Sequence, residues 1–434
     1  MSSDLKEIFN LFYLILIRGG WVGFGIALVY MFYKLYLDYI QITWYNKQDW
    51  VFLKVTPPKE NEKSPLAFEQ IFNQLHSIHD TITWAQRYIE GQVQIWFTWE
   101  IVSIGGAISN QVKILKKHRH TLEAAVYSQF PEAEITETED YLSRLPRYDT
   151  ETSEYDIFAF TYQLIREDAY PIKTYYDFEH ASTDTFVDPI AGMWEELGQI
   201  NPYEMFVIQY VLRPIDNDWK EEGYELVQKL KGVPESRRGG KGNFIVSFLG
   251  SVFGPLLDAI FIRSDSEGSH TRQMEEPPSL MLHLSEGEKE VISAIERNLA
   301  KWGYQTKIHC LYVSPREKYN PIVISRSVIG AFKSYGAANL NALEPYTRRW
   351  TKVNYWIFEN LEKPIIDLRL KWRKREYMKF IKRRFYFLGP PPNVLNTEEL
   401  ASILHFPQTT VAVPPIERVA VTKVQPPTEL PIAE

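Results

Sequence analysis

The sequence predicts an α+β protein with an N-terminal transmembrane helix, ferredoxin-like (split βαβ) units and a long basic C-terminal helix. Three observations lead to this prediction. Residues 8–33 form an apolar run with a single charge, and strand-like and helix-like patterns alternate between residues 49 and 335. Residues 368–384 carry nine Lys or Arg side chains against one acid. A chain of 434 residues is long enough for two or three domains with their own cores.

The N-terminal run from Ile8 to Tyr33 has Arg18 as its only charged residue. A helix of roughly 20 apolar residues crosses the hydrocarbon core of a bilayer. Placing the span over residues 14–34 lets the Arg18 side chain reach the headgroups. The charged and aromatic residues that follow are typical of a membrane–water boundary. We therefore predict a transmembrane anchor within residues 1–45, with a buried core helix as the alternative.

Residues 46–232 are predicted to form a first α+β region with two βαβ-like units. Pro65 opens an amphipathic helix, and Gly105-Gly106 joins two alternating runs as a β-hairpin. Strands are predicted over residues 49–55, 93–104, 107–115, 132–138 and 204–212, and helices over residues 66–78, 117–129 and 218–231.

A second α+β domain is predicted over residues 280–357. It begins with a strand over 280–284, and Ser285 and Glu288 then form a capping box for a helix. Gly303 is expected to end that helix as a C-terminal cap. A strand over 306–313 and a helix from Asn320-Pro321 to about residue 335 complete the unit.

Residues 233–279 are predicted to be a linker between these regions. Its two ends are polar, and the apolar stretch Phe244–Ile262 between them is interrupted by Gly250, Gly254 and Pro255. Three interpretations of this stretch stay open: an interfacial or re-entrant membrane segment, a second span, or a soluble helix packed on its own domain.

Residues 358–407 are predicted to hold the basic helix and a short helix that Asn396 and Glu399 cap. A Pro-rich tail follows over residues 408–434. The basic helix faces solvent, anionic headgroups or nucleic-acid phosphates. Its candidate contact residues are Arg369, Lys371, Arg373, Lys374, Arg375, Lys379, Lys382, Arg383 and Arg384. Residues 132–156 carry nine acids against two basic residues, and we interpret them as solvated surface.

Motifs that would indicate catalysis are weak. The glycines at 239–242 lack the spacing and the hydroxyl of a P-loop, and Ser251 is misplaced for a nucleophile elbow. His76 and His79 share a helix face without a recognisable third metal ligand. Cys310, the only cysteine, is expected to be a buried thiol in a reducing compartment. We predict no enzymatic activity, no cofactor, and no catalytic or metal-binding residues.

Several strings resemble a known family. These strings are LAFEQIFNQLHSIH (66–79), EIVSIGGAIS (100–109), DAYPIKTYYDFE (168–179), DPIAGMWEELGQINPYEMFVIQYVLRP (188–214), VLNTEELASILHFP (394–407) and PPTELPIAE (426–434). They resemble the membrane-anchored, non-motor N-terminal region that precedes or accompanies the ATPase of bacterial type IV secretion and conjugation systems. In fused relatives a RecA-like motor follows a segment like residues 426–431. The resemblance therefore implies that the motor, a ring-forming ATPase, is a separate polypeptide here.

The function expected from these observations is a non-enzymatic, membrane-anchored scaffold or adaptor of a type IV secretion or conjugation-like apparatus, which positions a separate ATPase. It would sit in the bacterial inner membrane as a single-pass oligomer, with its soluble part in the cytoplasm. Two alternatives stay open. One is a membrane-bound enzyme that acts on lipid or envelope substrates, and the other is a membrane-tethered DNA-binding protein.

Overall fold

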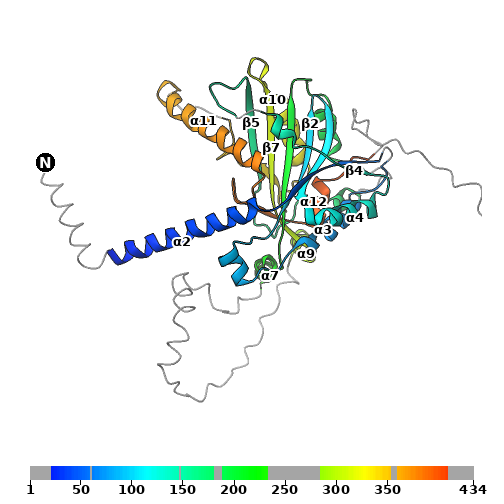
Figure 1. Ribbon diagram of the computed structural model, residues 1–434. Helices are drawn as coiled ribbons and strands as arrows, with labels where there is room; N and C mark the ends of the chain where they lie inside the picture. Colours follow the sequence, from blue (N-terminus) through cyan, green and yellow to red (C-terminus); the bar gives the residue numbers. More distant parts are fainter. Residues whose placement is uncertain are drawn as a thin grey trace, which may run out of the picture.

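One large antiparallel β-sheet forms the centre of this protein (Figure 1). The computed structural model describes residues 21–58, 61–145, 148–179, 188–232, 284–352 and 359–408. Nine strands from these ranges pair in the order β4-β1-β3-β2-β6-β7-β5-β8, and β9 also pairs with β7. The strands are β1 (Trp50–Thr56), β2 (Phe97–Ile104), β3 (Ala107–Leu115), β4 (Glu134–Glu137), β5 (Tyr155–Leu164), β6 (Met205–Pro214), β7 (Gly303–Pro315), β8 (Leu343–Pro345) and β9 (Asn393–Asn396).

The predicted fold of a membrane-spanning helix followed by ferredoxin-like units is wrong. Instead of separate small sheets, the strands join one mixed α/β architecture. The adjacent strands β6 and β7 come from two different predicted α+β regions, residues 46–232 and 280–357, and they pair from Met205↔Val313 to Pro214↔Tyr304. Because β6 is buried along nearly its whole length, its backbone N–H and C=O groups need strand partners on both edges, which β2 and β7 provide.

Most helices cover one face of the sheet, and α11 (Glu359–Arg383) covers the other (Figure 1). The first face carries α3 (Leu66–Leu75), α4 (Arg119–Gln129), α6 (Ala191–Gly198), α10 (Ile322–Lys333) and α12 (Thr397–Ile403). A separate pair, α7 (Trp219–Leu230) and α9 (Glu286–Leu299), has its own small apolar cluster. The short α5 spans Tyr175–Glu179, and α2 spans Trp21–Asn46.

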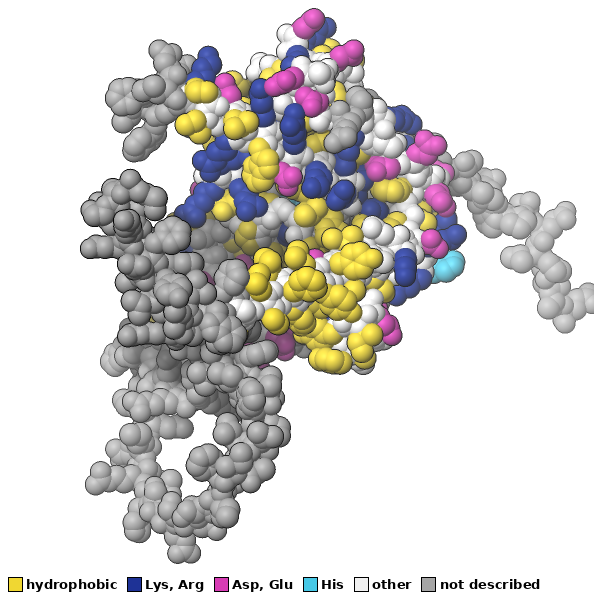
Figure 2. All heavy atoms as spheres, turned by 60° about the vertical axis from the view of Figure 1, so that its left-hand side comes forward, with side chains coloured by type: hydrophobic (Ala, Val, Ile, Leu, Met, Phe, Trp, Pro, Cys, Tyr) yellow, Lys and Arg dark blue, Asp and Glu magenta, His cyan; other side chains and the backbone are white. Residues whose placement is uncertain are grey.

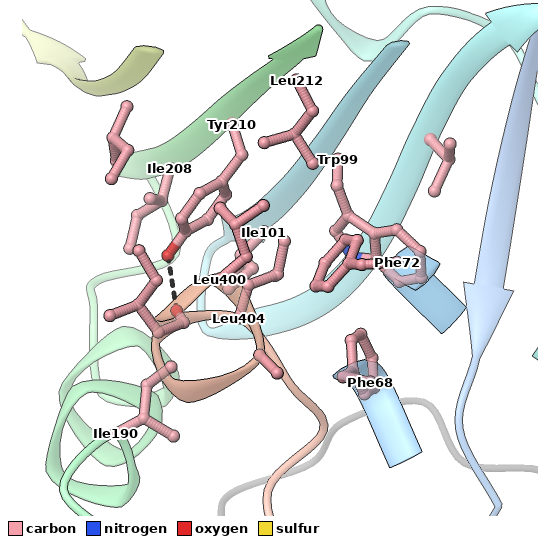
Figure 3. Packing of buried hydrophobic residues seen from close by; sticks show 14 of the residues in the cluster. Phe68, Phe72, Trp99, Ile101, Ile190, Ile208, Tyr210, Leu212, Leu400 and Leu404 are labelled. Atoms are coloured by element: carbon pink, nitrogen blue, oxygen red, sulfur yellow. Dashed lines mark hydrogen bonds between the residues drawn. The ribbon is translucent and has the colours of Figure 1, made fainter. Parts of the chain in front are cut away.

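The principal core lies between the sheet and this first set of helices (Figure 3). Alternate residues of each strand point into it, as the two-residue repeat of a strand requires. Leu400 of α12 and Leu404, the residue after this helix, insert their side chains here, and the Tyr210 hydroxyl donates a hydrogen bond to the Ile403 carbonyl (2.8 Å). Residues near the end of the chain are thus part of the core.

The opposite face, beneath α11, is more polar. Glu100, Gln209, Lys307 and His309 are all buried there. Two of these side chains donate hydrogen bonds to carbonyl oxygens at the end of α11 and in the following turn. Such carbonyls have no hydrogen-bond donor within the helix. Gln209 donates to the Ile381 carbonyl (3.2 Å), and Lys307 donates to the carbonyls of residues 386 (2.6 Å) and 388 (3.0 Å). The polar strand residues therefore hold the C-terminal end of α11 on the sheet.

The predicted hairpin and both predicted capping boxes are confirmed. Ile104 pairs with Ala107 across Gly105-Gly106, and both glycines have positive φ angles. Ser285 caps α9 with Glu288, and Asn396 caps α12 with Glu399. The assignment of Gly303 as a helix cap is wrong, because α9 ends at Leu299 and Gly303 begins β7. A Cβ at Gly303 would lie 2.5 Å from Nε1 of Trp219, so close packing explains this glycine.

The predicted transmembrane helix is not found. Across the residues that the structure describes, no helix combines the length and the apolar character needed to cross a bilayer. Helix α2 starts at Trp21, and its second half carries Lys34 and Asp38 and approaches the body. Residues 8–20 of the predicted span lie outside the described ranges. So do the whole predicted linker over residues 233–279, including Phe244–Ile262, residues 280–283 of the predicted strand, and the tail from residue 409.

Acid is expected to destabilise the contact between the sheet and α11 through His309. Its Nδ1 lies 2.8 Å from Thr161 Oγ1, and its ring packs on Phe380. Burial, with a smaller contribution from Lys307, lowers the pKa of His309 to about 3. An unfolded histidine binds a proton near pH 6.5, so stability is lost as the pH falls from about 6.5 towards 3, by roughly 2 kcal/mol at pH 5.

Urea unfolding at pH 7 and pH 5 measures this loss. In His309→Gln, the difference in unfolding free energy between the two pH values should be smaller than in the parent protein by about 2 kcal/mol. An unchanged difference would show that other groups cause the acid sensitivity.

Candidate functional site

Helix α2 has an anchored base and a projecting stem. At the base, Tyr45 is buried, stacks on Trp96 with ring centroids 5.0 Å apart, and meets the edge of Phe385 at 4.9 Å. The stem extends away from the sheet (Figure 1). Every residue from Ile26 to Tyr36 is exposed, and Lys34 is the only charged one among them. Eleven consecutive residues cover three helical turns, so apolar side chains are exposed on all sides of the stem.

The nine basic candidates on and after α11 differ in how the structure uses them. Four hold the helix in place: Lys374 and Arg384 are buried, Lys382 donates to the Leu145 carbonyl (2.6 Å), and Arg373 donates to the Trp350 carbonyl (3.2 Å). Two more, Lys371 and Arg375, form exposed ion pairs with Glu151 (2.7 Å) and Asp149 (3.0 Å).

The acidic residues that pair with α11 belong to the block over residues 132–156. Asp156 binds Lys374 (2.7 Å) and Asp140 binds Arg384 (2.8 Å), in addition to the two exposed pairs. The hydrogen bond from Lys371 also lowers the pKa of Glu151. The interpretation of this block as solvated surface is therefore wrong for Asp140 and Asp156, whereas Asp149 and Glu151 are exposed. The two charge-rich segments partly neutralise each other.

Arg384, just after the last residue of α11, is the centre of a buried charge cluster. Its guanidinium donates to Glu100 (2.5 and 3.0 Å) and to Asp140 (2.8 Å to each oxygen). Glu100 also accepts hydrogen bonds from Tyr141 (2.7 Å) and Gln209 (3.1 Å). Arg384 has a positive φ of 53°, which the surrounding contacts must stabilise. This residue, predicted as a surface contact, is a structural clamp.

The remaining candidates, Arg369, Lys379 and Arg383, are exposed. Arg369 and Arg383 form no ion pair within the described part of the chain, and Lys379 lies 3.8 Å from Glu376. Figure 2 shows the face on which α2 and α11 are visible together, with apolar side chains of α2 below a region rich in Lys and Arg. We call this the α2–α11 face. The sequence indicated both helices, but not that they share one face.

A groove of about 720 Å³ opens elsewhere, where β2 and β7 end and β5 and β6 begin. Tyr141, Tyr155 and Tyr203 line it together with the charged side chains of Arg144 and Glu154. A neighbouring groove of about 470 Å³ shares Tyr203 with the first. None of the nine basic candidates lines either groove.

Of the two histidines considered as metal ligands, His76 is buried and packs against its neighbours, and the partly exposed His79 stacks on the His76 ring. Nε2 of His76 is 2.9 Å from the Ile215 carbonyl oxygen, and its ring stacks on Trp302. Burial is the main cause that lowers the pKa of His76. Burial also raises the pKa of the Cys310 thiol, which is fully enclosed. Within the described ranges, no three His, Cys, Asp or Glu side chains are grouped closely enough to hold a metal ion.

Comparison with known proteins places the chain in a family. No curated protein matches the sequence. Residues 39–418 match a family described as a domain of unknown function (DUF8128). This match includes the last eight residues of α2, the whole sheet and α11. The chain therefore belongs to the DUF8128 family.

Proposed function

We propose that this protein is a non-enzymatic scaffold that binds the surface of a membrane through α2 and holds a partner protein there. The observation that supports this proposal is the stem of α2. A helix that is apolar on all sides is not stable in water, and needs burial in protein or in lipid. Its exposed side chains include Ile26 (66% exposed), Val29 (71%) and Phe32 (75%).

A lipid environment suits this stem better than a single protein groove. A groove would cover one side of a helix, whereas the stem exposes apolar groups around its whole circumference. Tyr30, Tyr33, Tyr36 and Tyr39 are exposed along it, and tyrosine is enriched where an apolar phase meets water. We propose insertion of the stem into the near leaflet, with the sheet remaining outside the lipid.

For the partner, we propose a separate ATPase of the type IV secretion or conjugation class at the cytoplasmic surface of a bacterial inner membrane. The sequence resemblance supports this part of the proposal. Affinity purification of the full chain from detergent-solubilised cells tests it, and a P-loop ATPase should co-purify. Recovery of the chain without any ATPase would contradict the assignment of the partner and leave the membrane contact untouched.

Removing the apolar character of the stem should abolish vesicle binding. We expect the triple variant Ile26→Gln, Val29→Gln, Phe32→Gln to bind phosphatidylcholine vesicles at least about 100-fold more weakly than the parent protein. Burying each such side chain contributes about 1.5–3 kcal/mol, and 1.4 kcal/mol corresponds to tenfold in affinity. Vesicle flotation at several lipid concentrations measures the effect.

A matched control replaces three exposed apolar residues on other helices. Leu66→Gln, Tyr127→Gln and Ile322→Gln alter α3, α4 and α10, and this variant should float like the parent. If the parent protein itself does not float, or if both variants lose binding equally, the proposed function is wrong.

A further inference from the structure

The outward side of α11 combines cations with apolar side chains. Over residues 363–383, its exposed residues are Lys363, Pro364, Ile365, Leu368, Arg369, Trp372, Arg375, Lys379 and Arg383. Of these, 365, 368, 372, 375, 379 and 383 follow each other at three- or four-residue steps, so they form one stripe along the helix. The two described acids of this segment, Asp367 and Glu376, are only partly exposed. We call all nine exposed residues, from Lys363 to Arg383, the outer stripe.

We propose that the outer stripe binds the headgroups of anionic phospholipids, so that α11 is a second membrane contact beside α2. This inference rests on the proposed function, because α2 brings α11 close to the lipid. The inward side of α11 is already occupied by the acidic segment, and Lys374 is fixed there by Asp156. Of the outer cations, Arg375 already pairs with Asp149 (3.0 Å). The helix cannot turn Arg369 or Arg383 towards the acidic segment without breaking the pair between Lys374 and Asp156.

The apolar members of the stripe favour lipid over nucleic acid as the occupant. Ile365, Leu368 and Trp372 are 72%, 70% and 61% exposed. Next to a phosphate backbone these side chains would stay in water, whereas between lipid headgroups they reach apolar chains. Tryptophan in particular is enriched at the membrane interface. Figure 2 also shows the basic region of α11 on the face that carries the apolar side chains of α2.

The stripe predicts a dependence on lipid charge that α2 alone would not produce. Each Lys or Arg near an anionic surface contributes about 1 kcal/mol, or roughly fivefold in affinity. The triple variant Arg369→Gln, Lys379→Gln, Arg383→Gln should therefore bind vesicles containing about 30% phosphatidylglycerol roughly 100-fold more weakly. Its binding to pure phosphatidylcholine vesicles should equal that of the parent protein. These three side chains are chosen because their removal breaks no short ion pair within the described residues.

The control variant removes the same charge elsewhere. Lys117→Gln, Lys289→Gln and Lys333→Gln are exposed positions outside α2 and α11, and the control should retain affinity for anionic vesicles within about threefold. Circular dichroism and urea unfolding confirm that both variants fold.

The outcomes separate this inference from the proposed function. If the parent binds neither vesicle type, the proposed function fails and the inference fails with it. If the parent binds both vesicle types equally, α11 is not a lipid contact although α2 remains one. The same follows if the Arg369, Lys379, Arg383 variant and the Lys117, Lys289, Lys333 control behave alike. If the outer-stripe variant keeps vesicle affinity but loses affinity for a short DNA duplex, the stripe binds nucleic acid and the inference is overturned.

Discussion

Replacing Arg384 by Met should destabilise the protein by about 3–5 kcal/mol. The substitution leaves Glu100 without the cation that neutralises it, and Glu100 is almost fully buried (2% side-chain exposure). Burying an unpaired carboxylate is far more costly than burying a paired one. Asp140 loses both of its hydrogen bonds to the guanidinium, although it is partly exposed and can be hydrated. Urea unfolding monitored by tryptophan fluorescence measures the change.

The adjacent residue provides the control. Arg383 is exposed and forms no ion pair with a described residue, so Arg383→Met should change the unfolding free energy by less than about 0.5 kcal/mol. The double variant Glu100→Gln, Arg384→Met removes the uncompensated charge, and should be more stable than Arg384→Met by at least about 1 kcal/mol. If Arg384→Met and Arg383→Met unfold at the same urea concentration, the clamp does not contribute to stability.

The clamp also determines where the outer stripe points. Arg384 fixes the end of α11 through its side chain, and its carbonyl accepts a hydrogen bond from Trp96 Nε1 (2.8 Å). Trp96 in turn stacks on Tyr45 at the base of α2. One cluster therefore holds the bases of both helices of the α2–α11 face. In Arg384→Met, cleavage of α11 by trypsin should accelerate, because the helix contains many basic residues and loses this attachment.

Tight turns and helix starts could be predicted from the sequence because each depends on a few residues that are adjacent in the chain. Gly105-Gly106 specifies a tight turn, and Ser285 with Glu288 specifies the start of a helix, whatever the rest of the chain does. The arrangement of the strands could not be predicted in this way. Each strand-helix-strand segment is compatible with a small ferredoxin-like sheet, and only long-range pairs such as Ile208↔Cys310 distinguish that fold from one continuous sheet. The predicted elements also do not include β5, although its sequence YDIFAFTYQL is rich in aromatic residues.

Long-range contacts in the candidate site could not be predicted from the sequence either. The sequence identified both charge-rich segments, but it could not indicate that they lie against each other. Lys374 and Arg384 have the same residue types and spacing as the exposed cations around them, yet their side chains are buried. The signal that could have revealed this is the complementary charge of residues 132–156, which contains nine acids against two basic residues. Pairing between these two segments predicts that some of the nine cations are buried in ion pairs and are not contacts for lipid or nucleic acid.

A second large effect is expected at Lys301, next to the end of α9, where Lys301→Met should destabilise the protein by about 3 kcal/mol. Its ammonium group lies 2.5 Å from Glu69 on α3 and 2.9 Å from Glu398 on α12. The two carboxylates are nearly buried, with side-chain exposures of 4% and 6%, and each keeps one short hydrogen bond, from Tyr175 (2.6 Å) and Thr174 (2.6 Å) respectively. Without the ammonium group, two negative charges remain in the interior, and Arg297 at 3.6 Å from Glu398 compensates only part of them.

Lys289→Met, within α9, is the matched control, because the pair between Lys289 and Glu286 is exposed and such pairs contribute little. Both variants are compared by urea unfolding and by limited proteolysis followed by mass spectrometry of the C-terminal fragments. Lys301→Met should expose residues 393–408 to cleavage under conditions in which the rest of the sheet stays protected, because this lysine connects α12 to the helices around it. Equal protection in the two variants would show that the apolar contacts of Leu400 and Leu404 hold α12 without the ion pairs. That result would show that apolar packing, and not these ion pairs, holds α12 on the core.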